Sequence, residues 1–292
     1  MTQHTALIGL RAETSIHAGA GSSVNGIDLP IQREAPTDWP CVYGSAVKGA
    51  LRAKAEDKLG ADNASISQIF GPASDQPAEK EHAGALLVGD ARLLLLPIRA
   101  LTCHFKWLTC PAILQRLQRD SQRLGIPMSF AIPQPDKNTV ITATKQDSDL
   151  FLEEYRYTPE HADLSPLIAA ISAVSGIGED ELKPQLAIVD NDQFSFLSRY
   201  ATPVNAHIAI DNASKTVRQG ALWYEETLPP ETVLYFALAA QQSRAKDNAM
   251  PADKILASIT DDLLGDMPYL QLGGNETVGM GWCKINVNRA GD

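Results

Sequence analysis

Strand-like and helix-like segments follow one another along this chain in an irregular order. Short apolar or alternating runs predict strands, whereas apolar residues three and four apart predict helices. Strands are expected at residues 5–17, 84–101, 139–145, 204–226 (as a hairpin), 232–240 and in the last segment before residue 287. Helices are expected at residues 44–60, 111–125, 165–174, 190–201 and 251–264. This order favours an α+β fold over a regularly alternating one.

The length of 292 residues suits either one large domain or two small ones. No repeat of fixed period and no low-complexity linker divides the sequence, so we predict a single domain over residues 1–292 with insertions. Apolar residues make up 44% and charged residues 21%, which is typical of a globular protein.

The sequence predicts a cytoplasmic protein without a membrane partner. Residues 1–30 lack the basic start and apolar run of a signal peptide, and no segment has the apolar length of a membrane span. The cysteines form no CxxC pair, which predicts reduced thiols rather than a zinc site. They are Cys41, Cys103, Cys110 and Cys283.

The net charge of −10 and the pI near 5.1 argue, taken alone, against nucleic acid as a partner. Binding depends on the local field, however, and net charge does not report how charges are distributed. Acidic residues concentrate in segments such as residues 75–82 and 178–183, so a basic groove elsewhere stays open.

A long loop rich in glycine and proline follows the first predicted strand, and it carries Asp28 between Ile27 and Leu29. Long ordered loops in compact domains are usually functional. Aspartate is common in turns, where its side chain binds nearby backbone amides, and on chemistry alone this is the favoured role of Asp28, with a catalytic carboxylate as the alternative. His17 lies at the start of this loop and is a minor catalytic candidate, with a structural role as the alternative.

The helix predicted at residues 44–60 starts with glycine, and Ser45 is its expected N-cap. Lys48 and Arg52 lie four residues apart on one face. Backbone amides at a helix start attract phosphate, and these cations would add to that attraction. A solvated basic stripe is the simpler interpretation of the pattern. Neither a Walker A loop nor a GxGxxG fingerprint is present.

A second glycine-rich loop precedes the last strand, with Gly273, Gly274, Asn275 and Gly279 in it. Glycine allows a backbone to approach a ligand closely, although a wide strand connection needs the same residues. Upstream, the adjacent pair Glu225–Glu226 has the ligand chemistry for a metal. On a strand, however, the two carboxylates would point to opposite faces.

Several stretches, in this order along the chain, resemble one family: HAGAGSSVNGIDLPIQRE, GSAVKGALR with IFGP after it, GALWYEE, and LGGNETVGMGW. GDARLLLLPIRAL and RAKDN fit the same pattern. They resemble the repeat-associated mysterious proteins (RAMPs) of CRISPR systems. Within that superfamily they are most similar to the backbone nuclease subunit of the type III-B (Cmr) RNA-targeting effector complex.

The resemblance implies an RNA-recognition-motif-like (ferredoxin-like) palm with helical insertions and a β-hairpin thumb at about residues 203–229. The expected partners are a guide RNA, a target RNA, further copies of the chain in a filament, and other effector subunits. The expected activity is an endoribonuclease in which Asp28 cuts target RNA with a weakly bound divalent metal, Mg or Mn. The residues expected to contact RNA are Gly19, Gly21, Arg33, Ser45, Lys48, Arg52, Gly273, Gly274, Asn275 and Gly279.

Three alternatives stay open. The chain could be a non-catalytic scaffold for guide RNA, or a stand-alone phosphate-ester enzyme that holds phosphate at residues 44–51. In a third alternative, which concerns the thumb only, residues 204–226 belong to the palm sheet with Trp223 in the core.

Overall fold

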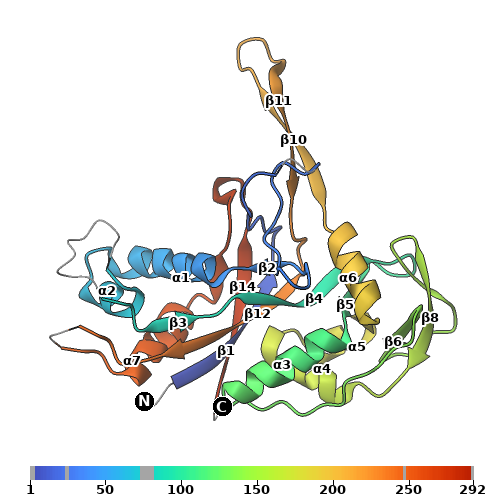
Figure 1. The fold of residues 1–292 in the computed structure, drawn as a ribbon, viewed down its shortest axis with the longest axis horizontal. Coiled ribbons are helices and arrows are strands. Elements are labelled where there is room, and N and C mark those ends of the chain that lie inside the picture. Colours follow the sequence, from blue (N-terminus) through green and yellow to red (C-terminus); the bar gives the residue numbers. More distant parts are fainter. Residues whose placement is uncertain (1–3, 24–25, 73–81, 246–247, 291–292) are drawn as a thin grey trace.

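The computed structural model describes residues 4–23, 26–72, 82–245 and 248–290. One large, mostly antiparallel sheet runs through the molecule, with helices packed along it (Figure 1). Its central strand β1 (His4–Ala12) pairs antiparallel with β12 (Val233–Ala240) on one side and with β14 (Trp282–Arg289) on the other. Beyond β12 lies β4 (Ala91–Arg99), again antiparallel. The four strands therefore run in the order β14-β1-β12-β4.

Strand β1 lies in the core of this sheet, because it is mostly apolar and is buried on both of its faces. Leu7, Ile8 and Leu10 are fully buried. Helix α4 (Ser165–Ser175) packs so closely on β1 that a Cβ at Gly9 would overlap the carbonyl oxygen of Val174. The contact therefore requires glycine. The observed strand ends earlier than the predicted one. After Ala12 the chain leaves the sheet, and the amides of Glu13 and Thr14 both donate to the carbonyl of Trp282.

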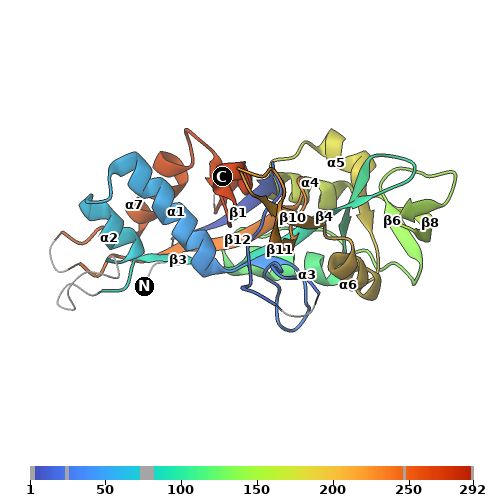
Figure 2. The ribbon, with the colours of Figure 1, turned by 90° about the horizontal axis from the view of Figure 1, so that it is seen from above.

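An insertion between β4 and β12 extends the sheet toward one end of the molecule and adds further helices (Figures 1 and 2). The sheet continues from β4 in the order β5-β9-β6-β8-β7. These strands are β5 (Phe105–Thr109), β9 (Leu186–Ile188), β6 (Thr139–Thr142), β8 (Tyr155–His161) and β7 (Leu150–Leu152). The other helices here are α3 (Pro111–Arg123), α5 (Glu179–Gln185) and α6 (Asn191–Tyr200).

The opposite end carries a second group of helices and the short strands that join them to the sheet (Figure 2). The helices are α1 (Gly44–Leu59), α2 (Ala64–Phe70) and α7 (Ala252–Ala257), which continues as the π-helical turn η2 (Ser258–Leu263). The remaining elements are β2 (Cys41–Val42), β3 (Leu86–Val88), β13 (Tyr269–Gln271) and the 3-10 turn η3 (Glu276–Val278).

Strands β10 (Val204–Ile210) and β11 (Val217–Glu226) form a separate two-stranded sheet that projects from the body (Figure 1). The alternative that they belong to the large sheet with Trp223 in the core is therefore wrong. Trp223 instead stacks on His207 across the hairpin, with ring centroids 5.4 Å apart. Asp211 stabilises the turn, because its carboxylate accepts from the amides of Ala213 and Ser214.

All four cysteines are unpaired in the structure. Burial raises the pKa of the Cys41, Cys110 and Cys283 thiols to about 12. In the part of the chain that the structure describes, no helix is both long and apolar enough to cross a membrane.

Candidate functional site

The loop after β1 folds back on itself and rises beside the base of the β10–β11 hairpin (Figure 1). The returning arm pairs with the outgoing arm: Gly19 bridges Ile31, and the amide of Ala20 donates to the carbonyl of Pro30. Gln32 ties the arms to helix α1. Its side chain donates to the Gly19 carbonyl at 3.0 Å and accepts from the Tyr43 amide at 2.6 Å.

Asp28 lies at the outer end of this loop, exposed, where the loop meets β11. Its Oδ2 accepts a 2.7 Å hydrogen bond from the amide of Tyr224. The next residue continues the pairing: the amide of Leu29 donates to the Tyr224 carbonyl, and the Leu29 carbonyl accepts from the Glu226 amide. The loop therefore forms one parallel β-bridge, Leu29 to Glu225, at the base of the hairpin, and this pairing fixes the position of the carboxylate.

A buried ion pair anchors the loop just after Asp28. Glu226, 2% exposed, accepts from the guanidinium of Arg33 at 2.5 Å, from the Thr202 hydroxyl at 2.6 Å and from the Ile31 amide at 3.1 Å. Arg33 also donates to the carbonyls of Asp38 and Ser198. These contacts hold the Arg33 guanidinium inside the chain and do not support its predicted contact with RNA.

His17 lies behind the loop, buried against the last residues of β11. Its Nδ1 is 2.8 Å from the Glu226 carbonyl, which only accepts, so Nδ1 carries the proton and a neutral ring leaves Nε2 as an acceptor. The Glu225 carboxylate is 3.8 Å from Nδ1. A Cβ at Gly19 would lie 3.0 Å from Nε2, so the glycine leaves room for the ring.

The second glycine-rich loop closes over His17. Gly273 has φ +86°, and a Cβ there would overlap the His17 carbonyl oxygen, which accepts from the amide of Gly274. Asn275, in the left-handed region at φ 61°, donates through its side chain to the carboxylate of Glu225. The structure thus brings Asp28, His17 and residues 273–275 together around the end of β11.

The remaining loop positions, Gly21 and Gly279, are open. Both have positive φ, at +95° and +84°, and a Cβ at either would meet nothing within 4 Å. They shape the turns without being crowded by the protein, so their predicted proximity to RNA remains a prediction.

Helix α1 begins at Gly44, where the sequence predicts it, but Ser45 is not its N-cap. The N-cap is Tyr43, which has no side-chain capping bond, and the first amide, Gly44, donates instead to the Asp90 carboxylate at 2.7 Å. Ser45 is exposed on the first turn. The carboxylate of Asp90 therefore occupies one amide that the sequence had suggested for phosphate.

The two cations predicted on α1 differ in their surroundings. Arg52 donates to Glu56 at 2.7 Å and to the carbonyl of Gly71 at 3.1 Å, so much of its hydrogen bonding is internal. Lys48 is half-buried, and burial together with the charge of Arg52 lowers the pKa of its ammonium group. Lys48 is the better candidate for an RNA phosphate.

The site does not supply a complete set of metal ligands. Across residues 4–23, 26–72, 82–245 and 248–290, no three His, Cys, Asp or Glu side chains are grouped to hold a metal ion. Asp28 offers one oxygen beside the one bound by Tyr224. Glu225 and Glu226 point apart, as expected, and each already has internal partners.

Three contributors were not recognised from the sequence: Gln32, Tyr224 and the buried role of Glu226. The signal for Glu226 was a pair of carboxylates directly after an apolar run at the end of a hairpin. Tyr224 acts through its backbone, which carries no residue-specific signal.

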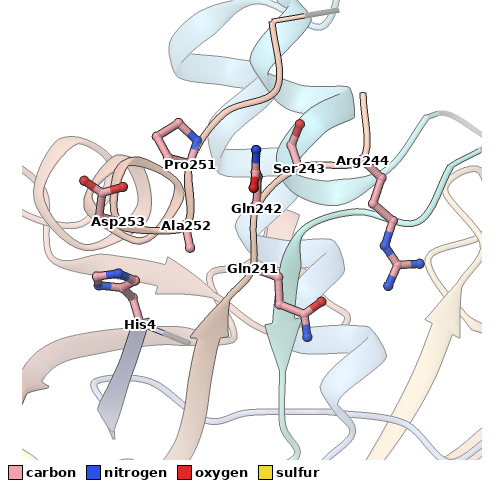
Figure 3. A pocket seen from close by; sticks show the side chains of 8 residues that line it. All are labelled: His4, Gln241, Gln242, Ser243, Arg244, Pro251, Ala252 and Asp253. Carbon is pink, nitrogen blue, oxygen red and sulfur yellow. The ribbon is translucent and has the colours of Figure 1, made fainter. Parts of the chain in front are cut away.

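A pocket lies away from this site, between the end of β12 and the start of α7 (Figure 3). Its volume is about 590 Å³. It is lined by His4, Gln241, Gln242, Ser243, Arg244, Pro251, Ala252 and Asp253. None of these is a predicted site residue, so the pocket is not part of the arrangement around β11.

Comparison with known proteins identifies relatives over nearly the whole chain. Residues 10–284 match the family model of the RAMP superfamily. The CRISPR system Cmr endoribonuclease Cmr4 of Pyrococcus furiosus is 34% identical, over 96% of this chain and 95% of that protein.

Two solved structures have the same fold. The crystal structure of oligomeric Cmr4 from Pyrococcus furiosus superposes with a TM-score of 0.75 at 29% identity, covering 100% of both chains. A subunit of type III-B Cmr-beta bound to cognate target RNA superposes with a TM-score of 0.76 at 21% identity, covering 98% of this chain and 97% of the other. The second likeness concerns the fold alone.

Proposed function

This chain belongs to the RAMP superfamily as a homologue of Cmr4, and we propose that it is an endoribonuclease of the type III-B effector backbone. In this proposal it binds a guide RNA, cleaves complementary target RNA at Asp28, and works with other copies of itself and other subunits. A complex of this kind acts in the cytoplasm. The observation that carries the proposal is the Asp28 carboxylate, exposed yet fixed by β11 at the base of a projecting hairpin.

The strand order supports the palm-and-thumb arrangement. In β14-β1-β12-β4 the first strand of the chain lies between the last two, with α1 following β1 and α7 preceding β14. This is the order expected of a ferredoxin-like βαββαβ palm. The β10–β11 hairpin would be the thumb. An isolated two-stranded ribbon is marginal in water, so neighbours or RNA would complete its stabilisation.

Cleavage would use the nucleophile that RNA itself carries. The 2′-OH attacks the adjacent phosphorus and loses its proton to a base, while the bond to the 5′-oxygen breaks. The products are a 2′,3′-cyclic phosphate and a 5′-hydroxyl, whose oxygen takes a proton from water. Rate comes from holding the 2′-OH in line with the leaving oxygen and from removing its proton. Asp28 has one carboxylate oxygen fixed by Tyr224 and an exposed setting for the other, which suits it to accept that proton.

His17 is better placed to shape the site than to reach RNA directly. It is 9% exposed, and its Nδ1 is bound by the Glu226 carbonyl. In our proposal it connects β11 with residues 273–275. A divalent ion such as Mg or Mn would bind Asp28 only together with RNA phosphate and water, because the protein offers a single carboxylate there.

Guide RNA would lie along α1 and the glycine-rich loops. Lys48 would contact phosphate, with Ser45, Gly21, Gly274 and Gly279 allowing close approach. The net charge of −10 makes tight binding by one copy unfavourable. Several copies on one guide would raise the apparent affinity, because each further contact becomes intramolecular.

A non-catalytic scaffold is the second candidate, and the same fold would serve it. The exposed, fixed Asp28 favours the enzyme, since guide binding alone has no need of a carboxylate there. The stand-alone phosphate-ester enzyme is less well supported, because Asp90 already binds the first amide of α1.

The experiment is to purify the tagged chain from its natural host under native conditions and analyse the nucleic acid. A discrete small RNA and cleavage of a complementary RNA would support the proposal. A guide RNA without cleavage would favour the scaffold, and a bound small nucleotide would favour the phosphate-ester enzyme.

A further inference from the structure

Three aromatic side chains form an exposed ridge on β8 and α6. Phe196 contacts Tyr155 edge-on, with ring centroids 5.3 Å apart, and Tyr200 at 4.8 Å. Tyr155, Phe196 and Tyr200 are 38%, 43% and 66% exposed. We call these three residues the aromatic ridge. A contiguous exposed aromatic surface of this kind marks an interaction site more often than scattered apolar residues do.

The ridge separates two hollows, and Tyr155 and Phe196 line both. One hollow, of about 270 Å³, also contains Asp192 and Arg156. The other, of about 170 Å³, contains Glu153 and Glu154. Each hollow therefore places a carboxylate beside an aromatic ring.

The two segments that carry the ridge are strongly acidic. Residues 145–163 and 190–200 hold eight carboxylates against three basic side chains, a net charge of −5. Two of the three bases are already engaged: Arg156 with Asp149 and Arg199 with Asp38. Glu153 pairs with Arg99, whereas within the described residues no ion pair joins Glu154 or Asp192 to a base. Such a surface repels RNA phosphate and attracts cations.

We propose that the aromatic ridge docks a partner protein through a segment rich in arginine or lysine. Cationic side chains would lie on the ring faces of Tyr155, Phe196 and Tyr200 and extend into the hollows to pair with Glu154 and Asp192. A cation over an aromatic ring is favourable, the more so once desolvated, and arginine suits it best.

The test is calorimetric titration of the purified chain with a short peptide of alternating Arg and Ala at physiological ionic strength. The double variant Phe196→Ser/Tyr200→Ser should bind about tenfold more weakly. Glu154→Gln/Asp192→Asn should weaken binding similarly. The matched control, Asp57→Asn/Asp62→Asn, removes the same charge from the α1 end of the molecule and should bind as the unaltered chain does. Circular dichroism establishes that each variant is folded.

Two competing probes decide the class of partner. A single-stranded RNA of comparable length should not displace the peptide from the ridge. If RNA displaced the peptide, and the ridge variants lost this RNA binding, the ridge would be a nucleic-acid surface and the proposal would be overturned. If the ridge and control variants weakened peptide binding equally, the peptide would be held by general charge attraction and not by the ridge, which would overturn the proposal. A change in oligomeric state on mutating the ridge, without a change in peptide affinity, would assign the surface to a second copy.

Discussion

The backbone amide of Tyr224 donates a 2.7 Å hydrogen bond to the carboxylate of Asp28, so the projecting hairpin itself positions the candidate catalytic group. The pairing of Leu29 with β11 extends this connection along the loop. Any movement of the hairpin base would move Asp28 with it. The hairpin and the cleavage loop are therefore expected to act as one unit.

Asp28→Asn should abolish cleavage of target RNA while leaving the loop in place. The asparagine oxygen still accepts from the Tyr224 amide, but it neither takes a proton nor carries charge. Losing general-base catalysis costs about 10²–10⁴ in rate. The measurement is single-turnover cleavage by the assembled complex, with target binding measured in parallel.

The matched control is Asp62→Asn, an exposed carboxylate beyond the end of α1, which should cleave normally. Normal cleavage by the Asp28→Asn complex would remove Asp28 from the catalytic step.

Arg33→Met should destabilise the protein rather than weaken RNA binding. It leaves the buried Glu226 carboxylate without its cation, and breaking a buried pair in this way costs about 3–5 kcal/mol. Arg199→Met breaks an ion pair with Asp38 whose side chains are about half exposed, and should cost far less, because solvent screens such a pair. Urea unfolding of both variants gives the comparison.

The two variants also separate a structural from an RNA-binding Arg33. If the two variants were equally stable, and only Arg33→Met reduced the salt dependence of guide binding, Arg33 would be a residue that contacts RNA.

Local patterns predicted the helices well, whereas the site depends on contacts between distant segments. Val47, Leu51, Ala55 and Leu59 follow the helical period. The first three are buried on one face of α1 as expected, whereas Leu59, in the last turn, is 47% exposed. The Asp28–Tyr224 contact joins residues 196 positions apart through a backbone amide. No side-chain pattern encodes such a contact, and the family resemblance alone indicated Asp28 as catalytic. Ser45 was mistaken for the N-cap because the residue that binds the first amide of α1 is Asp90, which is distant in sequence.

Gly273→Ala should be much more destabilising than Gly279→Ala, although both glycines have positive φ. At Gly279 the new methyl meets open space, so only the backbone conformation costs free energy, about 1 kcal/mol. At Gly273 the methyl also overlaps the His17 carbonyl, and the loop must shift, for a total of about 2–3 kcal/mol. Thermal unfolding compares the pair. Similar losses in both would show that the 273–275 loop adjusts freely around His17.

Lys48→Ala should weaken guide RNA binding and reduce its salt dependence, because one phosphate contact contributes about 0.7–1 to the slope. Lys54→Ala is the control on the same helix, since the Lys54 ammonium donates to the Met267 carbonyl. If Lys48→Ala left the salt dependence of guide binding unchanged, Lys48 and Arg52 would form only a solvated basic stripe on α1.

The lowered pKa of Lys48 adds a pH dependence. The charged form is lost as pH rises through a pKa below the usual 10.5, so guide affinity should fall on the alkaline side. Lys48→Arg keeps its charge there, and its advantage over lysine should grow with pH. A constant ratio between the two would mean that Lys48 does not contact phosphate.

Shortening the hairpin should separate folding from cleavage. Ile210 and Val217 face each other across the strands, so replacing residues 211–216 with an Asn-Gly dipeptide closes the ribbon with a two-residue turn. The change leaves the β-bridge between Leu29 and β11, at the base of the hairpin, untouched. The free energy of unfolding should therefore stay nearly the same. In the assembled complex, a shorter thumb would separate the target strand from the guide less completely, so cleavage should slow or lose its regular spacing. The readout is the ladder of products from a target RNA that spans several copies. A ladder identical in rate and spacing to that of the unaltered complex would show that the outer hairpin takes no part in presenting RNA to Asp28.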